Sequence, residues 1–566
     1  MNMLFQSKSK SLTGAKILVE CLRQQDVKNT YLVPGESYLS VLDALTDVPE
    51  IELTVCRQEG GAAMMAAAHG KLTGRPGICM VTRGPGATNA SAGLHIACQD
   101  AIPMILFVGQ VAREMREREA FQEIDYRRMF GQVAKWVAEV DSPDRMAEIV
   151  SRAFHVAMSG RPGPVVLAVP EDMLTEHTKV NVPNLGLAKP ARATITSHDA
   201  DKFLNTLRSA KSPLIIVGGG VWSNDARRDL EDFATKWAVP VAASFRCQDY
   251  FNNVHPCYAG DSGIGINPIL AARIRNADVL ILLGTRFSEM ESSGYSLVGI
   301  PQGDQHIIHV YPDPEEIGRV YKPQLGVAAP PDEVIASLLH RDIPDFDLIA
   351  RRATVAQCNA EYNAWSTLPE GRGDLAMADV MRHIEGVLTD DAIVTNGAGN
   401  YTVWIHRFHK HRQYPSQLAP ISGSMGYGVP AAVAAARVMP ERQIVCFAGD
   451  GCFLMHGQEL ATAVQYKSNL VIIVVNNEMY GTIRMHQERN YPGRISGTDL
   501  VNPDFAALAK SYGCHGETVT RTDQFSGAWE RANVHEGPSL IELQVDPKLI
   551  TPTQTINDIR NASKTS

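Results

Sequence analysis

Two short polar motifs in the last third of the chain have the residue types of a site for a metal ion and a phosphate. GDG at 449–451 follows the apolar segment 443–448, and Asn477 follows the apolar segment 470–475. A helical pattern separates the two segments, so we expect one strand–helix–strand unit. Its right-handed crossover brings both strand ends to the same edge of a parallel sheet. Asp450 and Asn477 should therefore meet in space, although they are 27 residues apart (477 − 450).

The oxygen atoms at this edge indicate which ion it would take. Mg²⁺ prefers oxygen ligands and is commonly shared with bound phosphates, so Asp450 and Asn477 supply two ligands and the backbone carbonyl of Met479 a third. Gly449 and Gly451 would let the backbone approach a diphosphate closely. The alternative is a pair of simple turns, because Gly and Asp are common in turns. Two motifs that each end an apolar strand, with one helix between them, favour the metal site.

A second candidate for chemistry lies near the N-terminus. Glu59 stands where an expected strand ends and the small-residue helix EGGAAMMAAAHGKLTG begins. Glu59 could take part in catalysis. It could also be only a first-turn glutamate that the helix dipole favours, which is the commonest role of such a residue. Residue types alone leave both interpretations of Glu59 open.

The rest of the chain supplies the elements that must position these residues. Three blocks each alternate short apolar β-rich segments with longer helical patterns, which is typical of parallel α/β sheets. A chain of 566 residues is too long for one hydrophobic core. We predict an α/β fold of three similar domains, each a mainly parallel sheet flanked by helices, at residues 12–175, 195–340 and 374–548.

Composition excludes several classes of function. The net charge is −9 and no long basic segment occurs, so we expect no nucleic-acid partner. None of the ten cysteines forms a CxxC pair, which argues against a zinc site or a redox dithiol. The N-terminal residues lack the apolar stretch of a secretory signal, and no segment reaches the roughly 20 apolar residues of a membrane helix. We expect a cytoplasmic protein without membrane contact.

Beyond these motifs, nearly the whole chain resembles the thiamine-diphosphate-dependent enzymes, and most of all the large subunits of acetolactate synthase. The order and spacing of short segments across all three domains carry the resemblance. These segments are VPGES at 33–37, TRGPGATNA at 82–90, AFQEID at 120–125 with Lys135 beyond it, SGRPGPV at 159–165, SMGYG at 424–428, and the GDG and NN motifs.

The resemblance implies roles for individual residues. Glu59 would contact the aminopyrimidine ring of thiamine diphosphate, and Phe121, Gln122 and Lys135 would line the substrate side. The implied catalytic residues are Glu59, Gln122 and Lys135; the implied cofactor-binding residues are Pro34, Gly35, Glu59, Gly399, Asn400, Tyr401, Gly423, Met425, Gly449, Gly451 and Gly481; the metal ligands are Asp450, Asn477 and Met479. The three domains would then be a pyrimidine-binding (PYR), a central Rossmann-like and a diphosphate- and Mg²⁺-binding (PP) domain.

The resemblance also implies an activity and an assembly. The expected enzyme decarboxylates a 2-ketoacid such as pyruvate and ligates the resulting carbanion to a second carbonyl. The alternatives are a 2-ketoacid decarboxylase or an aldehyde or 2-hydroxyacyl lyase, and, from other classes, a flavin oxidase or a cofactor-binding protein without chemistry. Small 2-oxo acids or aldehydes would be the substrates. The active site would lie at the interface of a homodimer, or of a homotetramer.

Four departures from the family pattern put the substrate in doubt. Glu36 replaces Gly, Asn400-Tyr401 replaces Gln-His, His486 replaces Trp and Arg83 replaces Ser. A carboxylate at position 36 would disfavour some anionic substrates.

FAD, which the biosynthetic members hold in their central domain, stays open. The turn GGG at 218–220, with Arg161 and Arg286, favours it. The segments at 260–265 and 284–295 depart from the family pattern, and more of these positions argue against FAD than for it.

Overall fold

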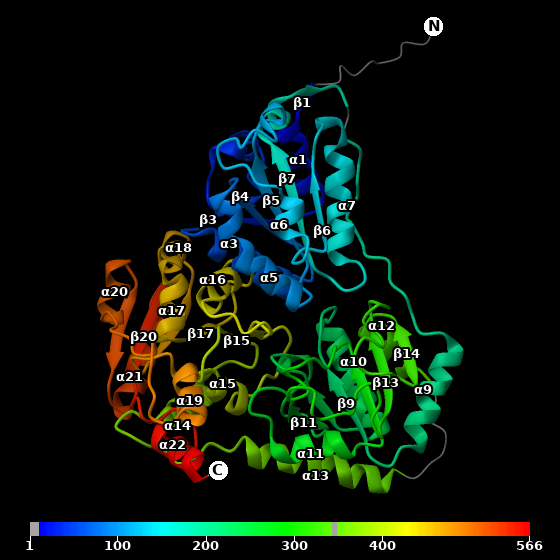
Figure 1. Cartoon of the computed structure of the whole chain (residues 1–566), viewed down its shortest axis with the longest axis vertical. Helices are drawn as coiled ribbons and strands as arrows, with labels where there is room; N and C mark the ends of the chain where they lie inside the picture. The colour runs from blue at the N-terminus through cyan, green and yellow to red at the C-terminus, as the bar shows by residue number, and fades with distance from the viewer. Residues whose placement is uncertain (1–10, 181, 342–347, 566) are drawn as a thin grey trace. The chain divides into compact units, whose positions relative to one another are not determined.

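A computed structural model describes residues 11–180, 182–341 and 348–565. Within these ranges the chain forms three six-stranded parallel sheets flanked by helices, which confirms the predicted α/β class (Figure 1). The chain divides into two compact units at Pro190 and Ala191, and the central and C-terminal sheets belong to the second unit. Residues 1–10, on which the expectation about a secretory signal rests, lie outside the described residues.

The first unit holds a sheet in the order β3-β2-β4-β5-β7-β6, beside a short antiparallel pair, β1 and β8. Its strands are β1 (Leu12–Thr13), β2 (Asn29–Leu32), β3 (Glu52–Val55), β4 (Gly77–Val81), β5 (Met104–Gln110), β6 (Trp136–Glu139), β7 (Pro164–Pro170) and β8 (His177–Thr178). Its helices are α1 (Gly14–Gln24), α2 (Leu39–Leu45), α3 (Glu59–Thr73), α4 (Pro85–Asn89), α5 (Ser91–Gln99), α6 (Tyr126–Phe130), α7 (Met146–Met158) and α8 (Glu171–Thr175).

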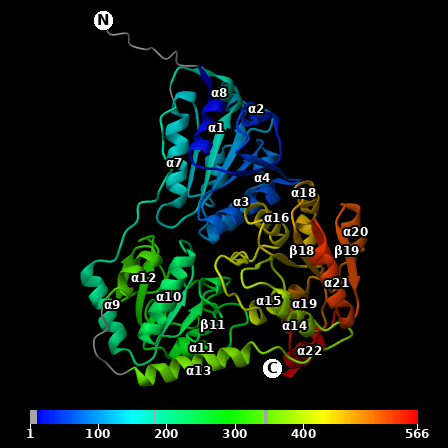
Figure 2. The same ribbon diagram turned by 180° about the vertical axis from the view of Figure 1, so that it is seen from behind.

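The central sheet has the order β11-β10-β9-β12-β13-β14, the strand order of dinucleotide-binding α/β folds. Its strands are β9 (Pro213–Val217), β10 (Val241–Ala243), β11 (Tyr258–Asp261), β12 (Val279–Leu283), β13 (His306–Tyr311) and β14 (Leu325–Ala328). Its helices are α9 (Ser197–Ser209), α10 (Asn224–Trp237), α11 (Pro268–Asn276) and α12 (Pro331–Leu339), and α13 (Ile349–Trp365) leads out of it (Figure 2).

The C-terminal sheet has the order β16-β15-β17-β18-β20-β19, which repeats the connectivity of the first sheet. Its strands are β15 (Ile393–Asn396), β16 (Gln417–Leu418), β17 (Ile444–Gly449), β18 (Leu470–Asn476), β19 (His515–Val519) and β20 (Pro538–Gln544). Its helices are α14 (Met377–Val387), α15 (Thr402–Phe408), α16 (Gly428–Val438), α17 (Asp450–His456), α18 (Leu460–Gln465), α19 (Gly481–Asn490), α20 (Phe505–Ser511), α21 (Thr522–Val534) and α22 (Ile556–Thr565).

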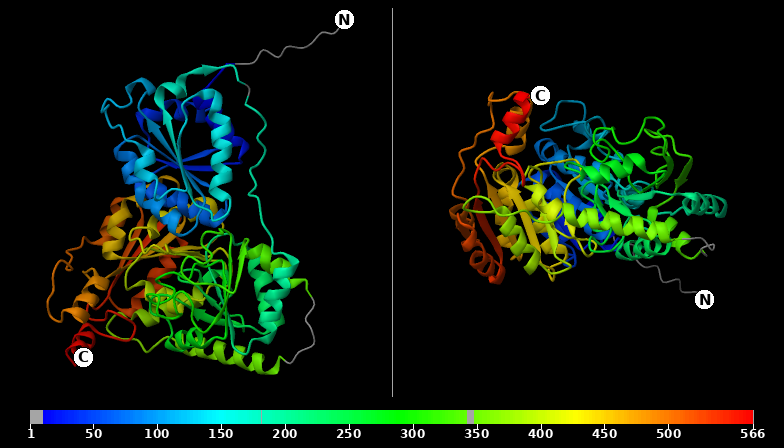
Figure 3. Two further views of the ribbon diagram at one scale, coloured as in Figure 1. Left: turned by 45° about the vertical axis from the view of Figure 1, so that its right-hand side comes forward. Right: turned by 90° about the horizontal axis from the view of Figure 1, so that it is seen from below.

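Strands covered on both faces explain the continuous apolar segments of the sequence. In β9, Ile215 and Val217 face the core under α9, α10 and α12, whereas Leu214 and Ile216 face the core under α11. Successive strand residues point to opposite faces, so a strand buried on both faces needs an apolar residue at every position. Helices on both sides of the parallel strands are visible in Figure 3.

The small residues of α3 follow from close packing against its neighbours. A Cβ on Gly93 of α5 would meet the Cβ of Ala63 at 2.4 Å, and a Cβ on Gly77 of β4 would meet the carbonyl oxygen of Ala66 at 1.9 Å. The helix therefore lies almost in backbone contact with α5 and β4, and this fixes its first residue, Glu59, relative to the sheet. Among the described residues, no helix has both the length and the apolar character needed to cross a membrane.

Candidate active site

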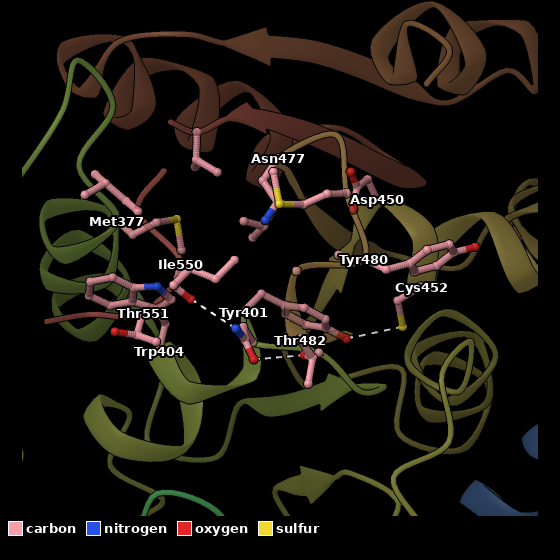
Figure 4. Close-up of a pocket in the computed structure, with 18 of the residues that line it drawn as sticks. Met377, Tyr401, Trp404, Asp450, Cys452, Asn477, Tyr480, Thr482, Ile550 and Thr551 are labelled. Atoms are coloured by element: carbon pink, nitrogen blue, oxygen red, sulfur yellow. Dashed lines mark hydrogen bonds between the residues drawn. The ribbon is translucent and has the colours of Figure 1, made fainter. Parts of the chain in front are cut away.

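The C-terminal sheet carries a cavity at its topological switch point. The order reverses between β15 and β17, and ligands of open α/β sheets bind at the carboxyl ends of the strands beside such a reversal. Residues that follow β15, β16, β17 and β18 line a cavity of about 280 Å³ there (Figure 4). Every cofactor and metal residue predicted for this domain lines it, namely Gly399, Asn400, Tyr401, Gly423, Met425, Gly449, Asp450, Gly451, Asn477, Met479 and Gly481.

Asp450 is the buried charge of this cavity. Asp450 is 3% exposed. Its carboxylate accepts hydrogen bonds from the backbone N–H of Gly451 at 2.9 Å and from the Asn502 amide at 2.8 Å. Burial raises the pKa of Asp450, and these hydrogen bonds oppose that rise. Among the described residues no group of three or more His, Cys, Asp or Glu side chains could hold a metal. A cation here would therefore rely on amide, carbonyl and phosphate oxygens beside this single carboxylate.

The two glycines that flank Asp450 are required by aromatic rings of the chain itself. A Cβ on Gly449 would lie 2.9 Å from the Tyr401 ring, and a Cβ on Gly451 would lie 2.6 Å from the Tyr480 ring. The Tyr401 hydroxyl accepts from the Gly397 N–H at 3.1 Å and donates to Cys452 Sγ at 3.3 Å. Both glycines were expected from the sequence to allow the approach of a diphosphate, and close packing against these rings is a second reason for them.

The rim of the cavity is held by the start of α19 and by the segment that leads to α22. Thr482 donates to Asn400 Oδ1 at 2.8 Å, and the Asn400 amide donates to the Ile550 carbonyl at 3.2 Å (Figure 4). Further along α19, the buried carboxylate of Glu488 pairs with Arg560 of α22 at 2.6 Å. The hydrogen bonds from Arg560 lower the pKa of Glu488 to about 2, against the opposing effect of burial.

The first sheet gathers a second set of predicted residues at its own switch point, between β2 and β4. A Cβ on Gly35, which follows Pro34 after β2, would lie 2.4 Å from the Cβ of Thr82, which follows β4. Glu59 opens α3 at the same edge, and its carboxylate accepts from the Asn89 amide at 2.9 Å. The structure thus brings the turn at Pro34-Gly35 and Glu59 to one edge, with Asn89 as a partner that the sequence argument had missed.

Gln122 joins this edge, whereas Lys135 does not. The Cβ of Gln122 lies 2.7 Å from the position that a Cβ on Gly84 would take, just after β4. Lys135 immediately precedes β6, so it lies at the amino edge of the sheet, where its ammonium group donates to the Arg161 carbonyl at 2.9 Å. Within the first unit Lys135 is therefore on the opposite edge from Glu59, and its catalytic role stays a prediction.

The departures from the family pattern lie on exposed or loop positions. Glu36 begins a 3-10 turn directly after Gly35 and is exposed, and His486 is exposed on α19. Arg83 pairs with Glu171 at 3.0 Å and donates to the Phe121 carbonyl at 3.2 Å. Arg83 thereby holds the loop that presents Phe121 and Gln122.

The central sheet is closed at its switch point, between β9 and β12. A Cβ on Gly219 would lie 1.8 Å from the carbonyl oxygen of Gly284, so the two strand ends are in backbone contact. The Trp222 indole donates to the Gly218 carbonyl at 2.9 Å and is itself nearly buried. The N-terminus of α10 is capped by the chain's own Ser223, whose hydroxyl accepts from a backbone N–H.

A buried carboxylate completes this closure. Glu291 is 5% exposed; its carboxylate accepts from the hydroxyl of Ser244, which follows β10, and from the backbone N–H of Ser288. Thr285, just after β12, donates to the same Ser244 hydroxyl at 3.3 Å. Glu291 thereby occupies two donors, the Ser244 hydroxyl and the Ser288 N–H, that phosphate oxygens would need, so these residues do not fit the diphosphate of FAD at the β9–β12 switch point.

Sequence reasoning missed two kinds of contributor to the C-terminal cavity. Trp404 and Met377 line it, but single apolar residues on helices give no functional signal. Asn502 bonds the Asp450 carboxylate from a loop 52 residues further along the chain. The sequence Asn502-Pro503-Asp504 looks like the start of a helix, and Asp504 does cap α20, so nothing local connected Asn502 with Asp450.

Comparisons with known proteins agree with this geometry. Three family models match the chain: thiamine pyrophosphate enzyme N-terminal TPP binding domain at residues 12–129, central domain at 200–338, and C-terminal TPP binding domain at 397–543. The acetolactate synthase large subunit of Corynebacterium glutamicum is 30% identical, over 94% of this chain and 87% of that protein. Acetolactate synthase isozyme 2 large subunit of Escherichia coli is 30% identical, over 94% and 96%. The mitochondrial catalytic subunit of Saccharomyces cerevisiae is 28% identical, over 95% and 81%.

Proposed function

Since the chain belongs to the thiamine pyrophosphate enzyme family, and within it to the acetolactate synthase large subunits, we propose that it is a thiamine-diphosphate- and Mg²⁺-dependent carboligase. It would decarboxylate a 2-ketoacid, with pyruvate as the first candidate, and join the remaining two-carbon unit to a second carbonyl compound. The observation that carries the proposal is the C-terminal cavity, which Asp450 and Asn477 both line together with the glycine turns at the ends of β15 and β17.

The residues of this cavity fit a diphosphate and Mg²⁺. Asp450 offers a buried carboxylate, Asn477 an amide and Met479 a backbone carbonyl, which are the oxygen ligands that Mg²⁺ takes beside phosphate. When bound, thiamine diphosphate supplies a carbon nucleophile that stores the electron pair released by decarboxylation. Met425, half-buried between β16 and α16 and part of the lining, would support the cofactor from the side.

Glu59 would hold the proton on which cofactor activation depends. Its carboxylate sits at the first turn of α3, at the carboxyl edge of the first sheet. The Asn89 amide fixes one oxygen at 2.9 Å, and the other lies 3.4 Å from the position of a Cβ on Gly86. Because Gly86 has no side chain, it leaves room in front of the Glu59 carboxylate. A glutamate that forms a hydrogen bond to a flat ring needs this room. Gln122 at the same edge would orient the substrate.

We propose a homodimer in which Glu59 of one copy faces the Asp450 site of the other. Exposed apolar side chains occur on both candidate surfaces: Leu39 is 64% and Phe121 75% exposed in the first unit, and Leu454 and Ile483 are 44% and 54% exposed beside the C-terminal cavity. Such side chains beside a site are typical of an interface between copies.

Complementation of two inactive variants tests this assembly. Co-expressed Glu59→Gln and Asp450→Asn chains would regain roughly a quarter of the parent activity if each site combines two copies, because half of the dimers are mixed and hold one intact site. No recovery from mixed dimers, verified by two affinity tags, would place the site within a single chain.

FAD has no role in the proposed reaction. The closed switch point between β9 and β12, with the Glu291 carboxylate beside it, supports a central domain without a bound dinucleotide. Purified protein should be colourless and should release no flavin on denaturation. Flavin released in an amount equal to the chain would contradict this part of the proposal.

Decarboxylation without ligation is the second candidate, and Glu36 favours it. A carboxyl group at the turn after β2, on the same edge as Glu59, could return a proton to the two-carbon unit before a second carbonyl arrives. Glu36→Gly should then shift products from acetaldehyde toward acetolactate. An unchanged product ratio would remove Glu36 from the account.

The direct experiment measures acetolactate formed from pyruvate by purified protein with thiamine diphosphate and Mg²⁺. The parent should form acetolactate, and Glu59→Gln should lose activity by about 10²–10⁴-fold while still binding the cofactor. If the cofactor binds but pyruvate is untouched, the substrate assignment fails and other 2-oxo acids or aldehydes become the candidates.

A further inference from the structure

Asn502 connects two strand ends of the proposed metal site. Its side-chain nitrogen donates to Asp450 Oδ2 at 2.8 Å and to Asn476 Oδ1 at 2.9 Å, and so uses both amide hydrogens. Asp450 follows β17, and Asn476 ends β18. One amide therefore ties together the two strands whose ends would supply the ligands Asp450 and Asn477.

The orientation of this amide follows from its partners. Both partner atoms, Asp450 Oδ2 and Asn476 Oδ1, are acceptors, so a reversed Asn502 amide would place oxygen against oxygen. The Asn476 oxygen is committed as an acceptor, because the Asn476 nitrogen donates to Glu542 at 2.7 Å. The Asn502 oxygen is buried and accepts no hydrogen bond from the described residues. The hydrogen bonds of the Asn502 side chain within the described residues are therefore made by its nitrogen.

The loop that carries Asn502 is itself fixed to the proposed metal loop. The Tyr480 N–H donates to the Thr498 carbonyl at 2.9 Å, and the Leu500 N–H donates to the Glu478 carbonyl at 2.8 Å. Met479 and Asp499 form an antiparallel bridge between these bonds. Residues 498–502, which we term the strap, therefore run along residues 478–480 and end at Asn502.

We propose that Asn502 is a positioning residue that fixes the Asp450 carboxylate for Mg²⁺, a role that rests on the proposed function. The Gly451 N–H restrains one carboxylate oxygen and Asn502 the other, so the rotation of the carboxylate is set before the ion arrives. A carboxylate without such donors would be free to turn away from the position that binds the ion. Hydrogen-bond partners of metal ligands typically contribute 10–100-fold to metal affinity.

The test uses the whole purified chain and measures thiamine diphosphate binding by equilibrium dialysis across a MgCl₂ series. Asn502→Ala and the nearly isosteric Asn502→Leu should both raise the Mg²⁺ concentration at half-saturation by about 10–100-fold, with cofactor binding restored at high Mg²⁺. Val501→Ala is the matched control, because Val501 lies in the strap and is fully exposed. Its half-saturation should equal that of the parent.

The outcomes separate this inference from the proposed function. If the parent needs Mg²⁺ but both Asn502 variants match it within twofold, the positioning role is wrong and the metal site stands. If cofactor binding by the parent does not depend on Mg²⁺, the proposed metal site fails first. Unfolding temperatures measured without metal and cofactor show whether each variant folds, and a variant that loses binding at every Mg²⁺ concentration while folded would also overturn the role.

Discussion

The central and C-terminal sheets contain the same number of parallel strands, yet their switch points differ completely. In the C-terminal domain the turns after β15 and β17 stand apart around a cavity that contains Asp450. In the central domain the turns after β9 and β12 touch through Gly219 and Gly284, and Glu291 accepts hydrogen bonds from a hydroxyl and an N–H of the chain itself. The fold alone therefore creates no site.

Each of the two switch points has a buried carboxylate, Glu291 in the central sheet and Asp450 in the C-terminal sheet, and the two differ in their surroundings. The donors of Glu291 are the Ser244 hydroxyl, just after β10, and the Ser288 N–H, in the segment that follows β12. Asp450 accepts hydrogen bonds from Gly451 and Asn502. These two donors orient its carboxylate, which still lines the cavity. The Asp450 carboxylate therefore stays accessible from a cavity, whereas the Glu291 carboxylate is enclosed by its own domain.

The largest expected effect is on cofactor binding at the edge that carries the cavity beside β15 and β17, which we call the open edge. Asp450→Asn keeps the shape of the side chain and removes its charge, so Mg²⁺-dependent cofactor binding should weaken by roughly 100-fold or more. Asp499→Asn is the control, because Asp499 lies in the strap with a side chain that is 79% exposed. Equal affinities of the two variants in a Mg²⁺ titration would show that Asp450 holds no ion.

We call the edge after β9 and β12, where Gly219 and Gly284 touch, the closed edge. Substitutions there should lower the stability of the protein. Gly219→Ala adds a Cβ 1.8 Å from the Gly284 oxygen at a φ of +77°, and should cost about 3 kcal/mol or more in the free energy of unfolding. Gly265→Ala has a similar φ of +78° with nothing within 4 Å, and should cost about 1 kcal/mol. Urea unfolding compares them; equal costs would mean that the edge is not closed.

A smaller effect is expected at the rim of the open edge. Glu488 is 1% exposed and pairs with Arg560, which is 28% exposed, so Glu488→Gln should lower stability by about 2 kcal/mol at pH 7. Its folded pKa of about 2 lies below the ordinary 4.5. The ion pair therefore stabilises the protein above pH 4.5, and this contribution is lost as pH falls toward 2.

Unfolding at pH 7 and at pH 3.5 measures this dependence. The gap between the parent and Glu488→Gln should be full at pH 7 and smaller at pH 3.5. Glu536→Gln changes an exposed glutamate of the same domain and should show no gap at either pH. A gap that widens on acidification would contradict the ion-pair explanation.

Much of the open edge could be predicted from the sequence, because the residues expected to bind the metal directly follow apolar strands. Asp450 and Asn477 are predictable in this way, since the end of a buried strand fixes where the next side chain lies. Asn502 and Glu291 could not be predicted, because each acts through a contact between loops that no local pattern encodes. The family pattern named Lys135, but its place at the amino end of β6 depends on where that strand begins, which the spacing of motifs does not reveal.

Thermal unfolding with different ligands tests the central claim most directly. The account predicts that thiamine diphosphate with Mg²⁺ raises the unfolding temperature of the parent, that Asp450→Asn abolishes this rise, and that FAD at the same concentration changes neither protein. Stabilisation by FAD, together with no response to thiamine diphosphate and Mg²⁺, would contradict the claim that the C-terminal switch point is the open one.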